Sequence, residues 1–470
     1  MSERITLLGW KCQRCGHEWL PRKRETPRTC PKCHSPYWDK SKVDDNLEIA
    51  KVQTSLKGFN EDNQEINFRE KIVDRKRTDY LTHSFFAYPA KFIPQIPRYF
   101  IKEYMHNHHS LLDPFCGSGT TLVEAQLLGY QSYGIEINPL GRLLTEVKTT
   151  PLKIRQYREE YDKLLQEIRS DYTVPLIPDF PNINYWFSEP VQRELGIIRA
   201  SIDSLDESPV KKFFKVCFAS IIRKSSNADP RISKPVYTEN MKSRHDRVIK
   251  PIEMFRAKVS EYGERVLTLS NFLESNTITA SMVGNDARKI NLPDRSVYLV
   301  LTSPPFINAQ EYFRTTKFEI YWTGLATPNE VRGLESKMIG LERIDDATSK
   351  ELHLLYDEGL QSVDDVIKKI YELDKNRAFI IFDYFSQMKN VFTEIMRILD
   401  DKGYFIITIG DNTIRKMPIK THELIIDLAS YVGFKTVKVN YDLIKVRSLT
   451  TKRNVTAGLM DKEWAMVFSK

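Results

Sequence analysis

The sequence predicts an α/β fold in which a doubly wound, mainly parallel sheet carries large helical insertions. Short apolar segments typical of strands alternate with helical segments from about residue 80 onward. A glycine-rich turn directly follows the first of these strands, at 110–113. Two long segments, at about 141–275 and about 311–385, interrupt the strand pattern and look largely helical. Such insertions account for a length of 470 residues, well beyond one ordinary domain.

Composition places the chain among folded globular proteins. Hydrophobic residues make up 41% and charged residues 28%, which excludes disorder throughout. A membrane-spanning helix needs about 18 or more consecutive apolar residues, and the chain has no such run. The N-terminus has no apolar core of the kind found in secretory signals. We therefore expect a cytoplasmic protein that does not associate with membranes.

Four of the six cysteines predict a metal site near the N-terminus. They form two Cys-x2-Cys pairs, and they are Cys12, Cys15, Cys30 and Cys33. Each pair can bring two thiolates to one ion, and two pairs complete a tetrahedral Zn²⁺ site whose four positions are filled, so its role is structural. We predict a zinc ribbon over 1–42 and a linker over 43–79. An iron–sulfur cluster or free thiols are the alternatives.

Charge is concentrated in three parts of the chain. Residues 1–42 contain ten Lys/Arg and four Asp/Glu, residues 211–250 eleven and three, and residues 341–375 five and ten. Two basic segments indicate a polyanionic partner, and nucleic acid is the usual one. Zinc thiolates would lower the charge of the first segment, so 211–250 is the stronger candidate. The candidate phosphate contacts within it are Arg223, Lys224, Arg231 and Lys234. A solvated basic surface is the alternative interpretation.

The glycine-rich turn predicts a cofactor site. The string Asp-Pro-Phe-Cys-Gly-Ser-Gly-Thr-Thr begins at Asp113, and its two glycines, Gly117 and Gly119, allow a tight turn before a helix at Thr120. Glu136 ends the next strand, where an acid can accept hydrogen bonds from ribose hydroxyls. The string is neither Gly-x-Gly-x-x-Gly nor a P-loop. Because an acid would repel a phosphate, the turn suits a cationic cofactor with a ribose, such as S-adenosylmethionine.

Two motifs together resemble those of the S-adenosylmethionine-dependent DNA amino-methyltransferases of restriction–modification systems. They are the turn at 113–121 and the string Thr-Ser-Pro-Pro-Phe at 302–306. Residues 83–94 and 284–288 also resemble segments of this family. The resemblance implies a Rossmann-like methyltransferase sheet, S-adenosylmethionine as cofactor and double-stranded DNA as substrate. It also raises a cognate restriction endonuclease as a partner.

The resemblance also assigns regions and site residues. The regions it implies are a cofactor-binding half at 80–150 and a catalytic half at 276–470. Between them lies a helical and basic insertion at 151–275 that the resemblance does not cover, and its charge makes it the candidate DNA-recognition region. The implied cofactor-binding residues are Asp113, Phe115, Gly117, Gly119, Thr120, Glu136 and Asp286. In the family, the acid that corresponds to Asp286 reaches the adenine of the cofactor.

The loop Ser303-Pro304-Pro305-Phe306 is the candidate catalytic site. Two prolines fix φ and remove two N–H donors, so the loop is stiff and rich in carbonyl acceptors. The Ser303 hydroxyl and the Pro304 carbonyl can hold the two hydrogens of an exocyclic amino group. Phe306 can stack on a base that has left the duplex. A Pro-rich turn with a buried Phe is the alternative for this string alone.

The serine of this loop bears on the base that is methylated. In the family, a Ser-Pro-Pro loop is more usual in cytosine-N4 enzymes, and Asp- or Asn-Pro-Pro-Tyr in adenine-N6 enzymes. Ser303 therefore favours cytosine N4, with adenine N6 as the second choice. An RNA amino-methyltransferase and a non-catalytic nucleic-acid-binding protein on the same scaffold remain as alternatives.

Overall fold

The chain consists of two compact units, Met1–Glu61 and Asp62–Lys470. The computed structural model describes residues 10–11, 18–19, 63–72, 77–89, 91–106, 110–243, 248–273, 278–307, 312–341, 360–444 and 461–470. In the first unit, β1 (Trp10–Lys11) pairs antiparallel with β2 (Glu18–Trp19). The predicted zinc ligands, Cys12, Cys15, Cys30 and Cys33, lie outside the described residues.

The second unit contains an eight-stranded sheet with the order β3-β11-β12-β8-β7-β4-β5-β6. The strands are β3 (Gln64–Glu65), β4 (Leu111–Asp113), β5 (Ser132–Ile135), β6 (Ala280–Gly284), β7 (Val297–Thr302), β8 (Leu399–Gly410), β11 (Lys435–Leu443) and β12 (Lys462–Ser469). Within this described sheet, β12 alone runs antiparallel to its neighbours. The predicted α/β fold with a large, mainly parallel sheet is therefore confirmed.

The strand order brings the two predicted motifs together. β4, which carries the glycine-rich turn, lies between β5 and β7. β7 pairs in parallel with β4 through Leu112 and Val300, and its last residue, Thr302, leads into the Ser-Pro-Pro-Phe loop. Because the carboxyl ends of parallel strands share one edge of a sheet, the turn, Glu136 and the loop lie at the same edge.

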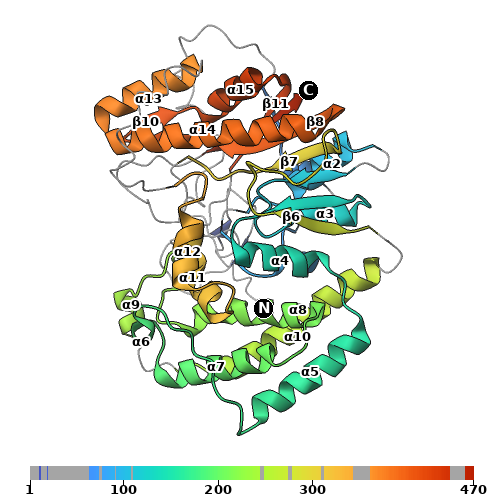
Figure 1. Cartoon of the computed structure of the whole chain (residues 1–470), viewed down its shortest axis with the longest axis vertical. Helices are drawn as coiled ribbons and strands as arrows, with labels where there is room; N and C mark the ends of the chain where they lie inside the picture. Colours follow the sequence, from blue (N-terminus) through green and yellow to red (C-terminus); the bar gives the residue numbers. More distant parts are fainter. Residues whose placement is uncertain are drawn as a thin grey trace, which may run out of the picture. The chain divides into compact units, whose positions relative to one another are not determined.

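Alternate residues of the central strands face opposite layers of helices. Leu111 and Leu299 belong to the hydrophobic core that contains α2 (Gln95–Tyr104), whereas Leu112 and Val300 belong to the core on the other face. The helices of that second face are α13 (Gln361–Leu373), α14 (Lys375–Ile398) and α15 (Thr421–Val432). In Figure 1, α14 and α15 lie against β8, and α2 and α3 lie beyond β7. Both faces of the central sheet are therefore covered, as expected for parallel strands.

The insertions form a helical region with a hydrophobic core of its own. Its helices are α4 (Pro139–Thr149), α5 (Ile154–Arg169), α6 (Ile183–Trp186), α7 (Glu189–Asp203), α8 (Pro209–Ser225), α9 (Glu239–Lys242), α10 (Pro251–Leu273), α11 (Tyr312–Trp322) and α12 (Pro328–Glu335). Figure 1 shows α5, α7, α8 and α10 grouped together, with α4 between them and the sheet. Phe213, Phe214 and Phe218 of α8 are buried in this core.

The structure adds elements that the sequence pattern did not indicate. Part of the expected linker forms β3, which extends the sheet beside β11, and α1 (Phe68–Lys71), whose Phe68 is fully buried. A hairpin of β9 (Asn412–Ile414) and β10 (Met417–Ile419) follows β8. No helix among the described residues is both long enough and apolar enough to cross a membrane.

Candidate active site

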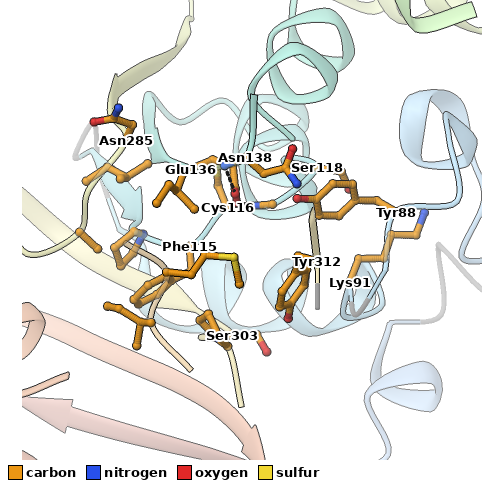
Figure 2. A pocket seen from close by; sticks show the side chains of 18 of the residues that line it. Tyr88, Lys91, Phe115, Cys116, Ser118, Glu136, Asn138, Asn285, Ser303 and Tyr312 are labelled. Carbon is orange, nitrogen blue, oxygen red and sulfur yellow. Dashed lines mark hydrogen bonds between the residues drawn. The ribbon is translucent and has the colours of Figure 1, made fainter. Parts of the chain in front are cut away.

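A pocket at the carboxyl edge of the sheet brings most of the predicted site residues together. Those that line it are Phe115, Gly117, Thr120, Glu136, Asp286, Ser303 and Pro305. Figure 2 shows Glu136 and Asn138 on one side of this pocket and Ser303 on the other, with Phe115 between them. The pocket therefore joins the cofactor turn to the candidate catalytic loop. Asp113, Gly119, Pro304 and Phe306 are not among its lining residues.

Asp113 is fully buried beneath the turn and is held by its own chain. Its carboxylate accepts hydrogen bonds from Thr121 Oγ1 at 2.6 Å, from Thr302 Oγ1 at 2.6 Å and from the backbone N–H of Phe115 at 3.1 Å. Burial raises the pKa of Asp113 to about 6, although the hydrogen bonds from the two threonines oppose this. Because Thr302 directly precedes Ser303, Asp113 links the cofactor turn to the catalytic loop.

Glu136 presents its carboxylate at the pocket wall. Oε2 accepts from the backbone N–H of Gly117 and Oε1 from that of Asn138, both at 2.8 Å. Burial raises the pKa of Glu136 to about 7, and the two backbone hydrogen bonds oppose it. Each carboxylate oxygen can accept more than one hydrogen bond, so Glu136 can still receive the hydroxyls of a ribose.

The two glycines of the turn serve different purposes. Gly117 has a φ of +53° and lines the pocket, so its backbone is available for close approach by a ligand. Gly119 has a φ of +77°, and a Cβ there would lie 2.9 Å from the Thr145 side chain of α4. The sequence interpretation expected the backbone of Gly119 to meet the cofactor. In the structure, the neighbour that requires a glycine at this position is α4.

Asp286 lines the pocket beyond β6 and forms a bidentate ion pair with Arg288. Arg288 Nε donates to Oδ1 and Nη2 donates to Oδ2, each at 2.8 Å. Burial alone would raise the pKa of Asp286, but the hydrogen bonds and charge of Arg288 outweigh it, and the pKa lies below its usual range. Arg288 also donates to Gln387 of α14 and to the carbonyl of Lys337, so it fixes the position of Asp286.

The Ser-Pro-Pro-Phe loop presents only part of its length to the pocket. Ser303 and Pro305 line it, whereas Pro304 is buried and the partly buried Phe306 packs against the hydrophobic core of the sheet. A Cβ on Gly340, which has a φ of +81°, would lie 2.9 Å from the Phe306 carbonyl oxygen. The segment around Gly340 therefore packs directly on the loop.

Several lining residues were not assigned by the sequence. They are Tyr88, Cys116, Asn138, Arg288, Tyr312 and Lys337–Ile339. Lys91 also lines the pocket, and its Nζ donates to the His83 carbonyl at 2.8 Å. The resemblance of 83–94 to a cofactor-side segment had indicated that this part of the chain lies near the cofactor. No local pattern marked Tyr312 or Lys337–Ile339, because they belong to an insertion that only the fold brings over the pocket.

The predicted phosphate contacts lie on α8 and the loop after it, and they differ in exposure. Lys224 and Arg231 are exposed, and Lys234 is half-buried. Arg231 forms a bidentate ion pair with the buried Asp229, yet 69% of its side chain remains exposed. The guanidinium of Arg223 donates to two backbone carbonyls, and burial lowers its pKa. Lys224, Arg231 and Lys234 are thus better placed than Arg223 to meet a polyanion.

The residues of the pocket fit S-adenosylmethionine. Glu136 offers a carboxylate for ribose hydroxyls, and Gly117 offers backbone without a side chain. Ile137, Ala287 and Ile339 supply apolar surface for a flat ring. A glycine-rich turn on a parallel sheet, an acid at the end of the next strand and a Ser-Pro-Pro-Phe loop in one pocket define a class of enzyme, the S-adenosylmethionine-dependent amino-methyltransferases.

Comparison with known proteins finds similarity to DNA methyltransferases. The family model of N6/N4 methyltransferases, described as DNA methylase, matches residues 27–140. The chain is 25% identical to the type II methyltransferase M.MvaI of Kocuria varians, over 84% of this chain and 89% of that protein. It is 22% identical to M.BsoBI of Geobacillus stearothermophilus, over 84% and 86%, and 20% identical to M.MjaII of Methanocaldococcus jannaschii, over 69% and 75%. The chain is an S-adenosylmethionine-dependent DNA methyltransferase, and it is similar to the N6/N4 amino-methylases.

Proposed function

We propose that this enzyme methylates the N4 amino group of cytosine at specific sites in double-stranded DNA, as the methyltransferase of a restriction–modification system. The observation that carries the proposal is that Ser303 lines the same pocket as Phe115, Gly117 and Glu136. The relatives named type II methyltransferases support the restriction–modification role. A cognate restriction endonuclease is the partner that we propose on the same ground.

The protein positions the amino group of the base and provides hydrogen-bond acceptors on a stiff loop. S-adenosylmethionine, when bound, supplies a methyl group that is already activated by its sulfonium. Ser303 Oγ and the Pro304 carbonyl hold the hydrogens of the amino group, so that its lone pair faces the methyl carbon. The new N–C bond forms as the methyl–sulfur bond breaks, and the extra N–H proton leaves to solvent. Holding the two reactants in this geometry accounts for the rate, without a nucleophilic side chain.

The proposal separates binding of the cofactor from transfer. Ser303→Ala and Phe306→Ala should each lower methyl transfer to DNA strongly, while the affinity for S-adenosylhomocysteine stays nearly unchanged. Transfer of labelled methyl to duplex DNA and to RNA, with calorimetry of the cofactor product, measures both effects. Equal transfer to RNA would support an RNA enzyme, and cofactor binding without any transfer would support a non-catalytic protein.

We propose that the basic segment of α8 and the following loop contacts DNA phosphates. The support is its net charge, with eleven Lys/Arg against three Asp/Glu in 211–250, and the exposure of Lys224 and Arg231. Replacing Lys224, Arg231 and Lys234 together by Met should weaken binding to any sequence. It should also flatten the dependence of log K on log salt by up to about 0.9 for each lost contact. An unchanged salt slope would make this segment an ordinary solvated surface.

We propose that the N-terminal unit binds one Zn²⁺. The support is the paired spacing of the ligands Cys12, Cys15, Cys30 and Cys33. In the part of the chain that the structure describes, no cluster of three or more His, Cys, Asp or Glu is arranged to hold a metal, so the proposed site rests on these four cysteines. Cys116 and Cys217 are buried as free thiols and are not part of it.

A further inference from the structure

Arg223 stands at the junction of three segments. It lies in the last turn of α8, and its Nη1 donates to the Thr315 carbonyl of α11 at 3.2 Å. Its Nη2 donates to the Ile232 carbonyl in the following loop at 2.5 Å. A planar guanidinium can serve two acceptors in fixed directions, which the ammonium of a lysine does less well. Arg223 therefore ties the loop of the basic segment to α11.

The loop at 226–238 is folded tightly enough to act as one body. The carboxylate of Asp229, whose side chain is 1% exposed, accepts from Arg231 and from Thr238 Oγ1. The backbone N–H of Asp229 donates to the Val236 carbonyl at 2.8 Å, which closes the loop on itself. Because these contacts hold the loop together, a displacement of the exposed Arg231 should also displace Ile232, whose carbonyl accepts from Arg223.

The same N-terminal end of helix α11 also reaches the cofactor pocket. Its first residue, Tyr312, lines the pocket. Thr316 Oγ1 accepts a hydrogen bond of 3.1 Å from Asn138 Nδ2, and the Asn138 backbone N–H donates to Glu136 Oε1. The carboxylate expected to bind the ribose is therefore connected, through Asn138 and α11, to the residues that hold Arg223.

A buried acid interacts electrostatically with Arg223. Glu319 of α11 is 2% exposed, and within the described residues its Oε2 has no hydrogen-bond partner. Burial raises the pKa of Glu319 to about 7, and the positive charge of Arg223 opposes this. Each of the two charges lowers the cost of burying the other. Arg223 is accordingly an internal tie more than a surface charge.

We propose that Arg223 is a positioning residue that couples contact of DNA phosphates with the loop at 226–238 to the affinity of the cofactor pocket. The inference rests on the proposed DNA contact of this loop. When phosphates fix the loop, Arg223 holds α11, and α11 holds Tyr312 and Asn138 in the arrangement that binds the cofactor. By linkage, cofactor binding then strengthens DNA binding by the same factor.

The test compares cofactor affinity with and without DNA. Calorimetry gives the Kd of S-adenosylhomocysteine alone and with a saturating random-sequence duplex, because phosphate contacts do not depend on sequence. In the wild type, the duplex should tighten this Kd about fivefold or more, the lower range of common coupling between sites. Arg223→Met should bring the ratio of the two Kd values near one and leave the Kd without DNA almost unchanged. Lys402→Met, the control, removes an exposed charge outside the proposed DNA contact and the pocket, and it should keep the wild-type ratio.

A second variant cuts the link at its other end. Thr316→Val removes the acceptor of Asn138 Nδ2 and leaves the loop at 226–238 unchanged. It should therefore also bring the ratio of the two Kd values near one, while the affinity for DNA without cofactor stays at the wild-type level. The coupling would be overturned if the duplex left the Kd of the wild type unchanged. It would also be overturned if Arg223→Met and Thr316→Val both kept the ratio of Kd values found for the wild type. The salt slope of the Lys224, Arg231 and Lys234 variant decides the DNA contact separately. An unchanged slope would overturn the phosphate contact and with it the coupling through this loop, whereas a flattened slope together with a wild-type ratio in Arg223→Met would overturn the coupling alone.

Discussion

At the scale of single residues, the buried Asp113 sets the geometry between the two halves of the active site. Sequence reasoning assigned it to the cofactor because the family places an acid at this position of the turn. In the structure its oxygens accept from Thr121, Thr302 and the backbone of Phe115. Because this carboxylate accepts hydrogen bonds both from the turn after β4 and from the end of β7, it fixes the distance between the turn and the loop. An error of about 1 Å in such a distance can lower the rate 100-fold.

The hydroxyl of Thr302 should therefore matter more for transfer than for binding. Thr302→Val keeps the shape of the side chain and removes the hydrogen bond to Asp113. We expect methyl transfer to fall by about tenfold or more, since the loop is no longer held at its distance from the turn. The Kd of S-adenosylhomocysteine should change little. A variant with wild-type turnover would show that the link has no part in catalysis.

The raised pKa of Glu136 predicts a pH dependence of cofactor binding. Ribose hydroxyls donate to the ionised carboxylate, and its pKa of about 7 means that protonation competes near neutral pH. Affinity for S-adenosylhomocysteine should weaken as the pH falls through about 7, because binding then requires release of a proton. The nearby Asp113 also raises this pKa, so the Glu136→Gln variant is the control. It should bind more weakly, with a flatter dependence around pH 7.

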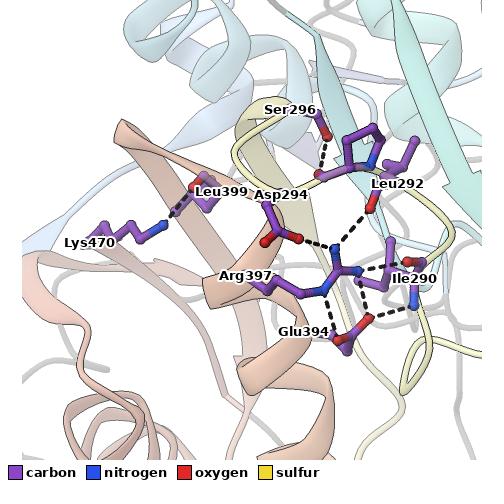
Figure 3. Close-up of polar contacts among 9 residues, drawn as sticks. Ile290, Leu292, Asp294, Ser296, Glu394, Arg397, Leu399 and Lys470 are labelled. Carbon is purple, nitrogen blue, oxygen red and sulfur yellow. Dashed lines mark hydrogen bonds and ion pairs between the residues drawn. The ribbon is translucent and has the colours of Figure 1, made fainter.

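At the scale of elements, β7 is fixed at both ends. Its carboxyl end is held through Thr302, and the segment before its first residue is held by Arg397 at the end of α14. Figure 3 shows Arg397 donating to the carbonyls of Ile290 and Leu292, and to Asp294 and Glu394. The backbone N–H of Ile290 in turn donates to Glu394 at 2.8 Å. The strand that leads to the catalytic loop is thus anchored to the helix layer that covers it.

Loss of this anchor should destabilise the protein in a pH-dependent way. Arg397→Met leaves the partly buried carbonyls of Ile290 and Leu292 without this donor and Glu394 without its ion-pair partner, which should cost about 2 kcal/mol and lower Tm by a few degrees. The hydrogen bond from Arg397 holds the pKa of Glu394 below its usual value. A lowered folded-state pKa gives stability that is present at neutral pH and is lost as the pH falls through that pKa.

The Tm difference between wild type and Arg397→Met should accordingly shrink on acidification below the ordinary range of a glutamate. Thermal melts at neutral and acidic pH measure it. Lys402→Met, at an exposed position, serves as the control and should leave Tm unchanged at both pH values. A Tm difference that grows toward acid pH would contradict the assigned role of Glu394.

The sequence predicted those elements whose signal is local. The strand at 297–302 and the 404–409 part of β8 are runs of mainly apolar residues, because parallel strands are buried on both faces. The helix at 120–127 is marked by glycines on both sides. The antiparallel direction of β12 and the pairing of β3 with β11 depend on contacts distant in sequence, and no local pattern encodes them.

The same limit applies to the site. The turn and the loop are contiguous strings, so their residues could be proposed from the sequence, and part of them line one pocket. Tyr312 and Lys337 reach the pocket from an insertion, and Arg223 looked like a surface cation although it is an internal tie. Its role depends on Glu319 and Thr315, nearly a hundred residues away, which periodicity and spacing do not reveal.

At the scale of the whole molecule, the described site lies entirely within the second unit. Every residue that lines the pocket falls in 62–470. A truncated chain of 62–470 should therefore bind S-adenosylhomocysteine with nearly wild-type affinity. The full chain should contain about one zinc by elemental analysis, and Cys30→Ser should lower that content. Zinc retained by the truncated chain would contradict the assignment to the four N-terminal cysteines.

The central claim is the identity of the methylated atom, and product analysis tests it most directly. Duplex DNA methylated by the purified enzyme is digested to nucleosides and analysed by mass spectrometry against standards. The account predicts N4-methyldeoxycytidine, because Ser303 and Pro304 form a loop built to hold an amino group. N6-methyldeoxyadenosine would contradict the base and keep the class of enzyme. 5-Methyldeoxycytidine would contradict the mechanism itself, because methylation at carbon needs a cysteine nucleophile and the loop at 302–306 has none.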